Sequence, residues 1–217
     1  MLITLVRHGN TIANNEKWLQ GHVDTLLTEQ GFHQAKVVGE RLACESFDKV
    51  YCSDLTRCKQ TAEAIAAHHQ TAPIEYRLSL RERDFGTLSR KPIKFLGKES
   101  TRLQIDVDEL VRRHQGETEQ MFESRITLAY EEIVSEAMEA NYSHILIITH
   151  GGPLYILLLR WTNKLGYKVE DGQINMNRCG NTSVSRVRIH PPHQGTIEFY
   201  NSMAHLKVTE QSAPPAV

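Results

Sequence analysis

Residues 144–153 read HILIITHGGP, an apolar run followed by a histidine, two glycines and a proline. The run from His144 to Thr149 lacks the polar alternation of a half-exposed strand, and this is typical of a strand buried on both faces of a parallel sheet. Pro153 is tolerated in the first turn of a helix, because the N–H that proline lacks has no partner there. The stretch therefore predicts a buried strand that leads directly into a helix reaching about Trp161.

The same alternation of apolar strand and amphipathic helix runs through the rest of the chain. Three more buried strands are predicted at Leu2–Val6, Lys49–Cys52 and Ile74–Leu78, helices at Thr28, Asp54 and Thr118, and a closing hairpin at 182–189 and 197–200. The order predicts the α/β class: a single three-layer α/β/α domain over residues 1–210 with a mostly parallel central sheet. Residues 211–217, which include Ser-Ala-Pro-Pro, are predicted to form a disordered tail.

Composition and charge limit the classes of function. The chain has 217 residues, of which 40% are hydrophobic and 24% charged, as in an ordinary globular domain. Its formal net charge of -1 provides no overall basic field that would attract nucleic acid or anionic lipid. No apolar run approaches the roughly 20 residues that cross a bilayer. We therefore expect neither nucleic acid nor a membrane as a partner.

The cysteines and the first residues bear on the location of the protein. Residues 1–6 are apolar but too few for the core of a signal peptide, and no basic segment precedes them. The four cysteines show no CxxC spacing, so we expect reduced thiols rather than disulfides. Together these features predict a cytoplasmic protein, with the nucleus as the other compartment that fits.

Charged side chains or histidines follow each of the four predicted parallel strands. Arg7 and His8 follow the first, Arg57 the second, Glu82 the third and His150 the fourth. Each has an ordinary structural interpretation when taken alone: a loop residue, a surface arginine on a helix, a surface carboxylate, a histidine satisfied in the core. Because the carboxyl ends of parallel strands meet at one edge of a sheet, we expect the five side chains to surround one site.

This set of side chains suits the transfer of a phosphoryl group. A neutral imidazole can attack phosphorus, guanidinium groups donate paired hydrogen bonds to phosphate oxygens, and a carboxylic acid can protonate the departing oxygen. Free N–H groups where Gly151 and Gly152 open a helix also favour an anion. We expect His150 and the arginines to supply the positive charge. His68, His69, His190 and His193 lack a third ligand at convincing spacing, so no metal site and no cofactor are expected.

The residues resemble the histidine phosphatase superfamily, which includes phosphoglycerate mutases and fructose-2,6-bisphosphatases. The resemblance extends from Leu2 to about Leu206 and rests on motifs in the family's order: Leu5-Val6-Arg7-His8-Gly9, Gln20-Gly21, Ser53-Asp54-Leu55-Thr56-Arg57, Leu80-Arg81-Glu82, Gly116-Glu117-Thr118, Thr149-His150-Gly151-Gly152 and Asn181-Thr182-Ser183. It implies a phosphoglycerate mutase-like fold, with His8 as the nucleophile that becomes a transient phosphohistidine. It also implies that Glu82 is the proton donor and that the phosphate pocket contains Arg7, Asn14, Arg57, His150 and Gly151.

Three activities remain open from the sequence: hydrolysis, a mutase reaction and non-catalytic binding of phosphorylated ligands. Mutases of the family usually carry a basic insertion between the equivalents of Glu82 and Gly116, whereas the basic residues of 86–115 are scattered here. The five reacting positions are all present, which weighs against a pure binder. We therefore expect a phosphatase acting on small phosphorylated metabolites, such as sugar phosphates or bisphosphates. Arg83, Lys91 and Lys94 are candidates for a second phosphate or for a solvated basic face.

Overall fold

The computed structural model describes residues 1–69, 72–170, 174, 178–190 and 194–211, and it contains one seven-stranded sheet. The strands are β1 (Leu2–Arg7), β2 (Lys49–Ser53), β3 (Ile74–Arg77), β4 (His144–Thr149), β5 (Lys168–Val169), β6 (Val184–His190) and β7 (Gln194–Ser202). Their spatial order is β3-β2-β4-β1-β6-β7-β5, and β6 alone among these runs against the others. The predicted α/β class with a mostly parallel sheet is confirmed.

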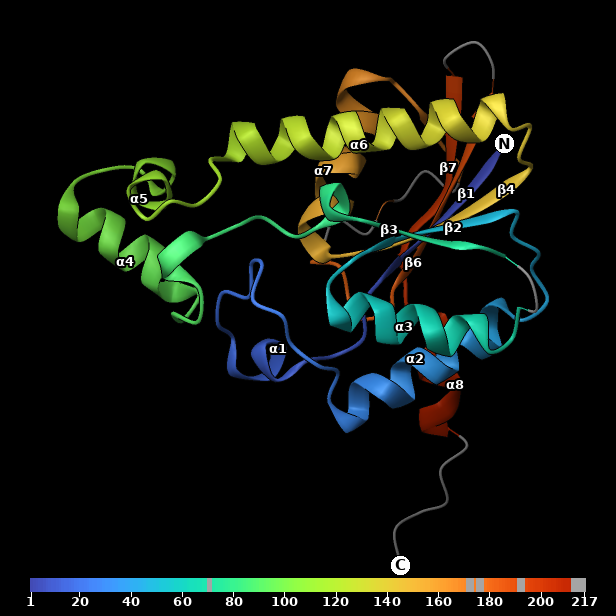
Figure 1. Cartoon of the computed structure of the whole chain (residues 1–217), viewed down its shortest axis with the longest axis horizontal. Coiled ribbons are helices and arrows are strands. Elements are labelled where there is room, and N and C mark those ends of the chain that lie inside the picture. The colour runs from blue at the N-terminus through green and yellow to red at the C-terminus, as the bar shows by residue number, and fades with distance from the viewer. Residues whose placement is uncertain (70–71, 171–173, 175–177, 191–193, 212–217) are drawn as a thin grey trace, which may run out of the picture.

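Helices cover both faces of this sheet (Figure 1). On one face lie α6 (Glu119–Glu139) and α7 (Gly151–Leu159), which continues into a π-helical turn, Arg160–Lys164; on the other lie α2 (Glu29–Leu42), α3 (Thr56–Ala66) and α8 (Ala204–Gln211). Each face has its own apolar core, one packed against α6 and α7 and one against α2 and α3. The sheet is thus the middle of three layers, as predicted.

Local sequence signals set the ends of these helices. The hydroxyl of Thr28 caps α2 by accepting from the Gly31 N–H, and Thr118 caps α6 through the Met121 N–H, both as expected for this residue type. The helix predicted to begin at Asp54 begins at Thr56 instead, so Arg57 is its second residue. Of the predicted tail, Gln211 ends α8, and 212–217 lie outside the described residues.

A smaller group of helices stands apart from the sheet beside the carboxyl ends of its strands (Figure 1). It comprises α1 (Ile12–Glu16), α4 (Lys94–Leu103), α5 (Val107–Arg113) and the short 3-10 turn Gly86–Leu88. Leu19, Leu88, Leu110 and Val111 form its separate apolar core. A second 3-10 turn, Leu78–Leu80, follows β3 directly and packs against the sheet through Leu80. Within the described part of the chain, no helix is both long and apolar enough to cross a membrane.

Candidate active site

The ends of β1 and β4 bring two histidines together. These strands pair in parallel with Arg7 opposite Thr149, and the His8 N–H continues the ladder to the Thr149 carbonyl at 3.0 Å. His8 and His150 therefore leave the sheet side by side. Their ring centroids lie 5.2 Å apart at an interplanar angle of 61°.

The His8 ring is held in its neutral form. Its Nδ1 lies 2.7 Å from the Gly9 carbonyl oxygen, so Nδ1 carries the proton and Nε2 keeps its lone pair. Burial, together with the charges of Arg57 and Arg7, lowers the pKa of His8 well below its ordinary value. The whole residue is only 3% exposed.

The backbone after His8 is fixed by a close crossing with the start of α2. A Cβ on Gly9 would lie 2.6 Å from the Gly31 carbonyl oxygen, and one on Gly31 would lie 2.1 Å from the carbonyl oxygen of Asn10. Glycine at both positions permits this approach. The Gly9 N–H also donates to the Thr61 hydroxyl at 3.0 Å, which ties the loop to α3.

His150 is fully buried and uses both ring nitrogens within the protein. Nδ1 accepts a hydrogen bond from Arg57 Nε at 3.2 Å, and Nε2 lies 2.8 Å from the Ser53 hydroxyl. Burial and the nearby Arg57 and His8 lower the pKa of His150 well below its ordinary value. The expectation that His150 contributes positive charge is therefore wrong for this structure, because a buried imidazole beside a guanidinium stays neutral. The arginines carry the charge.

Arg57 is completely buried. Besides its bond to His150, it donates from Nη1 to the Val23 carbonyl at 2.9 Å and from Nη2 to the Gly21 carbonyl at 3.0 Å. A guanidinium has five N–H donors, so two remain, one on each terminal nitrogen. Arg57 lines the cavity that also contains His8, so its positive charge would act on an anion bound there.

Arg7 presents a buried donor that lacks a partner among the described residues. Its Nη1 donates to the Cys179 carbonyl, whereas its Nε is buried without a hydrogen bond. A Cβ on Gly151 would lie 3.4 Å from this Nε, so glycine at 151 keeps the neighbouring space free. A buried N–H without an acceptor is unfavourable, and an oxygen of a bound anion would satisfy it.

Asn14 and Glu82 also line the cavity around His8. The Asn14 Oδ1 accepts from the Thr11 N–H and from Asn181 Nδ2, both at 3.1 Å, which leaves the Asn14 amide N–H groups for a ligand. The Glu82 carboxylate accepts from the Gly152 N–H at 3.1 Å and from the Arg83 N–H at 3.0 Å. Of the predicted site residues, Arg7, His8 and Arg57 line the same cavity and Gly151 lines the neighbouring one. His150 lies against His8 but is not among the described residues that line either cavity.

Two cavities meet at this point and share Arg7, Glu82, Gly152 and Arg178. One, of about 350 Å³, extends towards Tyr155 and Cys179. The other, of about 270 Å³, extends past His8 and Arg57 to an apolar wall of Trp18, Leu19, Phe85, Ile93 and Leu96. Sequence reasoning missed Arg178 and this wall. Most of these residues lie outside regular helices and strands, and the others, Ile93 and Leu96, lie at the start of α4, which was not predicted.

The candidates for a second phosphate site lie elsewhere. Arg83 donates to the Asp108 carboxylate at 2.5 Å and to the Glu117 carbonyl at 2.8 Å, and Lys91 lies over the Phe95 ring. Among the described residues, neither of these nor Lys94 lines the two cavities. No three described His, Cys, Asp or Glu side chains are grouped so that they could hold a metal ion, and His193 lies outside the described residues.

Comparison with known proteins identifies the family to which the chain belongs. The model of the histidine phosphatase superfamily (branch 1) matches residues 3–202. A broad-specificity phosphatase of Saccharomyces cerevisiae is 33% identical over 76% of this chain and 73% of its own length. Phosphoglycerate mutase-like protein 4 of Arabidopsis thaliana is 31% identical over 95% and 87%. In fold, a phosphoglycerate mutase from Bacillus anthracis str. Sterne covers 97% of the chain, matched by 96% of its own, with a TM-score of 0.81 at 22% identity. The chain is a phosphatase and belongs to branch 1 of the histidine phosphatase superfamily.

Proposed function

We propose that the enzyme hydrolyses phosphate monoesters of small metabolites by transferring the phosphoryl group to His8 and then to water. The observation that carries this proposal is the meeting of a neutral, buried His8 with two guanidinium groups and a carboxyl group in one cleft. The chemistry of phosphoryl transfer requires a nucleophile, cations for the equatorial oxygens and a proton for the leaving group.

In the first step His8 Nε2 forms a bond to phosphorus while the bond from phosphorus to the ester oxygen breaks. Glu82 must hold a proton at this stage and delivers it to the departing oxygen, so that an alcohol leaves. Arg7 Nε, the two remaining N–H groups of Arg57 and the Asn14 amide donate to the phosphoryl oxygens.

In the second step a water molecule attacks the phosphohistidine. The Glu82 carboxylate takes a proton from the water as its oxygen bonds to phosphorus, and the bond from phosphorus to Nε2 breaks. Inorganic phosphate is released, and His8 and Glu82 return to their starting protonation states. In both steps the positive charges of Arg7 and Arg57 stabilise the negative charge on the phosphoryl oxygens. The residues of this chain therefore supply the groups that the two steps need.

The cavities favour a small organic leaving group that carries a second anionic group. The lobe beyond His8 offers apolar wall residues for a carbon skeleton, while Arg178 stands where both lobes meet and its charge acts on Arg7. An exposed guanidinium at this position suits a second phosphate or a carboxylate. Sugar phosphates and bisphosphates of modest size therefore remain the substrate class that we propose.

The segment between Glu82 and Gly116 supports hydrolysis over mutase activity. Of its basic residues, Arg102 pairs with Glu99 in α4, while Arg112 and Arg113 pair with Glu109 in α5. These pairs lie on the outer surface of the helices, and among the described residues none of the three lines the cavities. They offer no basic pocket for the carboxylate of a phosphoglycerate.

The proposal includes the cellular compartment in which the protein acts. All four cysteines are free thiols, and Cys52, Cys58 and Cys179 are buried. This supports a reducing compartment, the cytoplasm or the nucleus.

A trapping experiment tests the proposed function. Brief incubation with a ³²P-labelled monoester should label the wild-type protein with a phosphate that is stable to base and labile to acid, as expected of a phosphoramidate. His8→Ala should remain unlabelled and lose turnover of p-nitrophenyl phosphate. A panel of phosphoesters, with 3-phosphoglycerate and 2-phosphoglycerate included, then separates hydrolysis from mutase exchange. Wild-type protein that binds the monoester but neither becomes labelled nor releases phosphate would be a non-catalytic binder, and full activity in His8→Ala would refute the mechanism.

A further inference from the structure

The segment that carries Glu82 has no regular structure of its own. It runs from Arg81 to Asp84 between two 3-10 turns, so no helix or strand ladder pairs its backbone groups. A carboxyl group that delivers a proton needs a fixed position, because a displacement of about 1 Å can cost ~10²-fold in rate. Something other than secondary structure therefore has to hold this segment.

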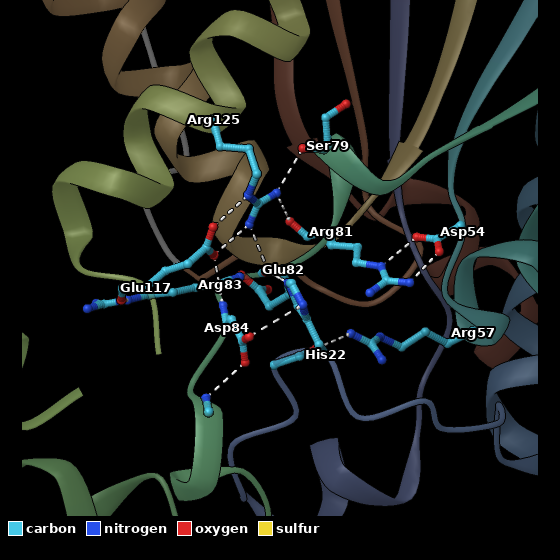
Figure 2. A network of polar contacts seen from close by, with 12 residues as sticks. His22, Asp54, Arg57, Ser79, Arg81, Glu82, Arg83, Asp84, Glu117 and Arg125 are labelled. Carbon is cyan, nitrogen blue, oxygen red and sulfur yellow. Dashed lines mark hydrogen bonds and ion pairs between the residues drawn. The ribbon is translucent and has the colours of Figure 1, made fainter. Parts of the chain in front are cut away.

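Arg125, from the second turn of α6, supplies that support (Figure 2). Its Nη1 donates to the carbonyl of Ser79 at 2.8 Å and to that of Arg81 at 3.0 Å, and its Nη2 donates to the Glu82 carbonyl at 3.1 Å. One guanidinium therefore binds two carbonyl groups of the segment and one of the 3-10 turn that precedes it. The planar fork of arginine suits this task, whereas lysine has a single nitrogen.

Glu117 holds Arg125 in place and contacts the far side of the same segment. Its carboxylate accepts hydrogen bonds from Arg125 Nε and Nη2, both at 2.7 Å, and from the Asp84 N–H at 2.9 Å. Burial disfavours the charge on Glu117, but the hydrogen bonds from Arg125 and the Asp84 amide outweigh it and lower the pKa of this carboxyl. Both side chains are largely enclosed, with 22% of Arg125 and 16% of Glu117 exposed.

Two further contacts tie the segment to other parts of the chain. His22 Nε2 lies 3.0 Å from the Glu82 carbonyl oxygen, and Arg81 Nε donates to Asp54 at 2.7 Å (Figure 2). The Glu82 carbonyl thus has a ring nitrogen and a guanidinium as its two partners. The side-chain carboxylate of Glu82 accepts a hydrogen bond from the Gly152 N–H.

We propose that Arg125, braced by Glu117, is a positioning residue that fixes the backbone of Glu82 so that its carboxyl group reaches the leaving oxygen. The inference rests on the proposed role of Glu82 as the proton donor. It differs from a purely structural role in one measurable respect. Loss of Arg125 should hinder the departure of leaving groups that need a proton, and it should spare those that do not.

Leaving-group dependence provides the test. Nitrophenolate is a stable anion and leaves without protonation, whereas the alkoxide of an alkyl phosphate such as glycerol 2-phosphate does not. For Arg125→Met and Arg125→Lys, kcat/KM should fall about 10²-fold for glycerol 2-phosphate and at most about threefold for p-nitrophenyl phosphate. The matched control is Arg77→Met, because Arg77 also ties α6 to the sheet region, through Glu136, without reaching the segment. It should lower both rates equally or leave both unchanged.

Combination with Glu82→Gln separates the inference from the function on which it rests. Glu82→Gln alone should show the same difference in kcat/KM between the two leaving groups. The double variant Glu82→Gln/Arg125→Lys should have the same kcat/KM for glycerol 2-phosphate as Glu82→Gln alone, because the proton donor is already absent. If Glu82→Gln shows no such difference, the role of Glu82 is wrong. If it shows the difference but both Arg125 variants slow the two substrates equally at unchanged unfolding temperature, Arg125 does not act through Glu82. Should Arg125→Met fail to fold, Arg125→Lys and Glu117→Gln decide the question alone.

Discussion

The His8 and His150 rings meet edge to face with their centroids 5.2 Å apart, although they come from strands far apart in the chain. The parallel register of β1 and β4 explains this, because the residues that follow paired strand ends emerge at neighbouring points. Arg57 then approaches the pair from α3 and donates to His150. The two rings and one guanidinium share a dry environment, which keeps both imidazoles uncharged.

Both rings should remain neutral at pH values where free imidazole becomes charged. Burial first, and then the arginines, lower the pKa of His8 and of His150 well below the ordinary 6.5. Long-range ¹H–¹⁵N spectra should therefore show both rings neutral as the pH falls from about 7.5 to about 5.5. In Arg57→Met, both pKa values should rise towards 6.5. Titration of either ring near 6.5 in the wild-type protein would contradict the assignment.

His205 should make the folded state sensitive to acid. It is buried, accepts from Arg41 Nη1 at 3.0 Å, and its pKa is lowered to about 4 by burial and by the charge of Arg41. As the pH falls, His205 is therefore protonated in the unfolded chain before it is protonated in the folded protein. Its contribution to the free energy of unfolding is complete above about pH 6.5 and is lost as the pH falls towards the pKa of the folded state.

His205→Gln should flatten that dependence. Between about pH 6.5 and the folded pKa, one proton bound only by the unfolded state lowers the free energy of unfolding by up to about 1.4 kcal/mol per pH unit. Urea midpoints at pH 7.5 and 5.5 should differ less in the variant than in the wild type. An equal difference in both proteins would show that other histidines dominate.

The sequence predicted those parts of the site that depend on strand ends. Arg7, His8 and His150 could be placed because their strands are apolar runs whose pairing is parallel, and Arg57 and Glu82 follow the next two strands. Gly152 was placed at a helix start after its strand, but its N–H, expected to be free for an anion, donates to Glu82 instead. Arg125 could not be placed in this way, because its role depends on distant partners that no local pattern indicates. The charge of His150 was predicted wrongly, since burial and the direction of the Arg57 guanidinium decide it and neither is visible in the sequence. Helices α4 and α5 were also not predicted, because they pack on a small core of their own.

Gly152 should tolerate no side chain. A Cβ there would lie 2.0 Å from Glu82 Oε1 and 3.0 Å from the Phe122 ring, so alanine would push the Glu82 carboxyl group away from the Gly152 N–H. We expect kcat/KM of Gly152→Ala for alkyl phosphates to fall about 10²-fold. Gly97 in α4 provides the control, since a Cβ there meets nothing within 4 Å. Gly97→Ala should keep full activity and add about 0.5–1 kcal/mol to the free energy of unfolding. Equal activities of the two variants would exclude this role for Gly152.

Arg57 should be needed for both stability and activity. Its side chain is completely buried, and its loss leaves the carbonyls of Gly21 and Val23 without these donors. Each buried acceptor left unpaired costs about 1–3 kcal/mol, so Arg57→Met should unfold at markedly lower denaturant. It should also lower kcat/KM about 10²- to 10³-fold, because two donors to the phosphoryl oxygens disappear.

Inorganic phosphate separates these two effects of Arg57. The wild-type protein should gain thermal stability as phosphate is added, since a ligand that binds only the folded state stabilises it, whereas Arg57→Met should gain far less. Arg188→Met is the control: Arg188 is half exposed, pairs with Glu198 on the sheet, and its removal should cost no more than about 1 kcal/mol. It should respond to phosphate as the wild type does. If Arg57→Met is stabilised by phosphate to the same extent, its guanidinium is a structural support and the phosphoryl oxygens are held by Arg7 and Asn14.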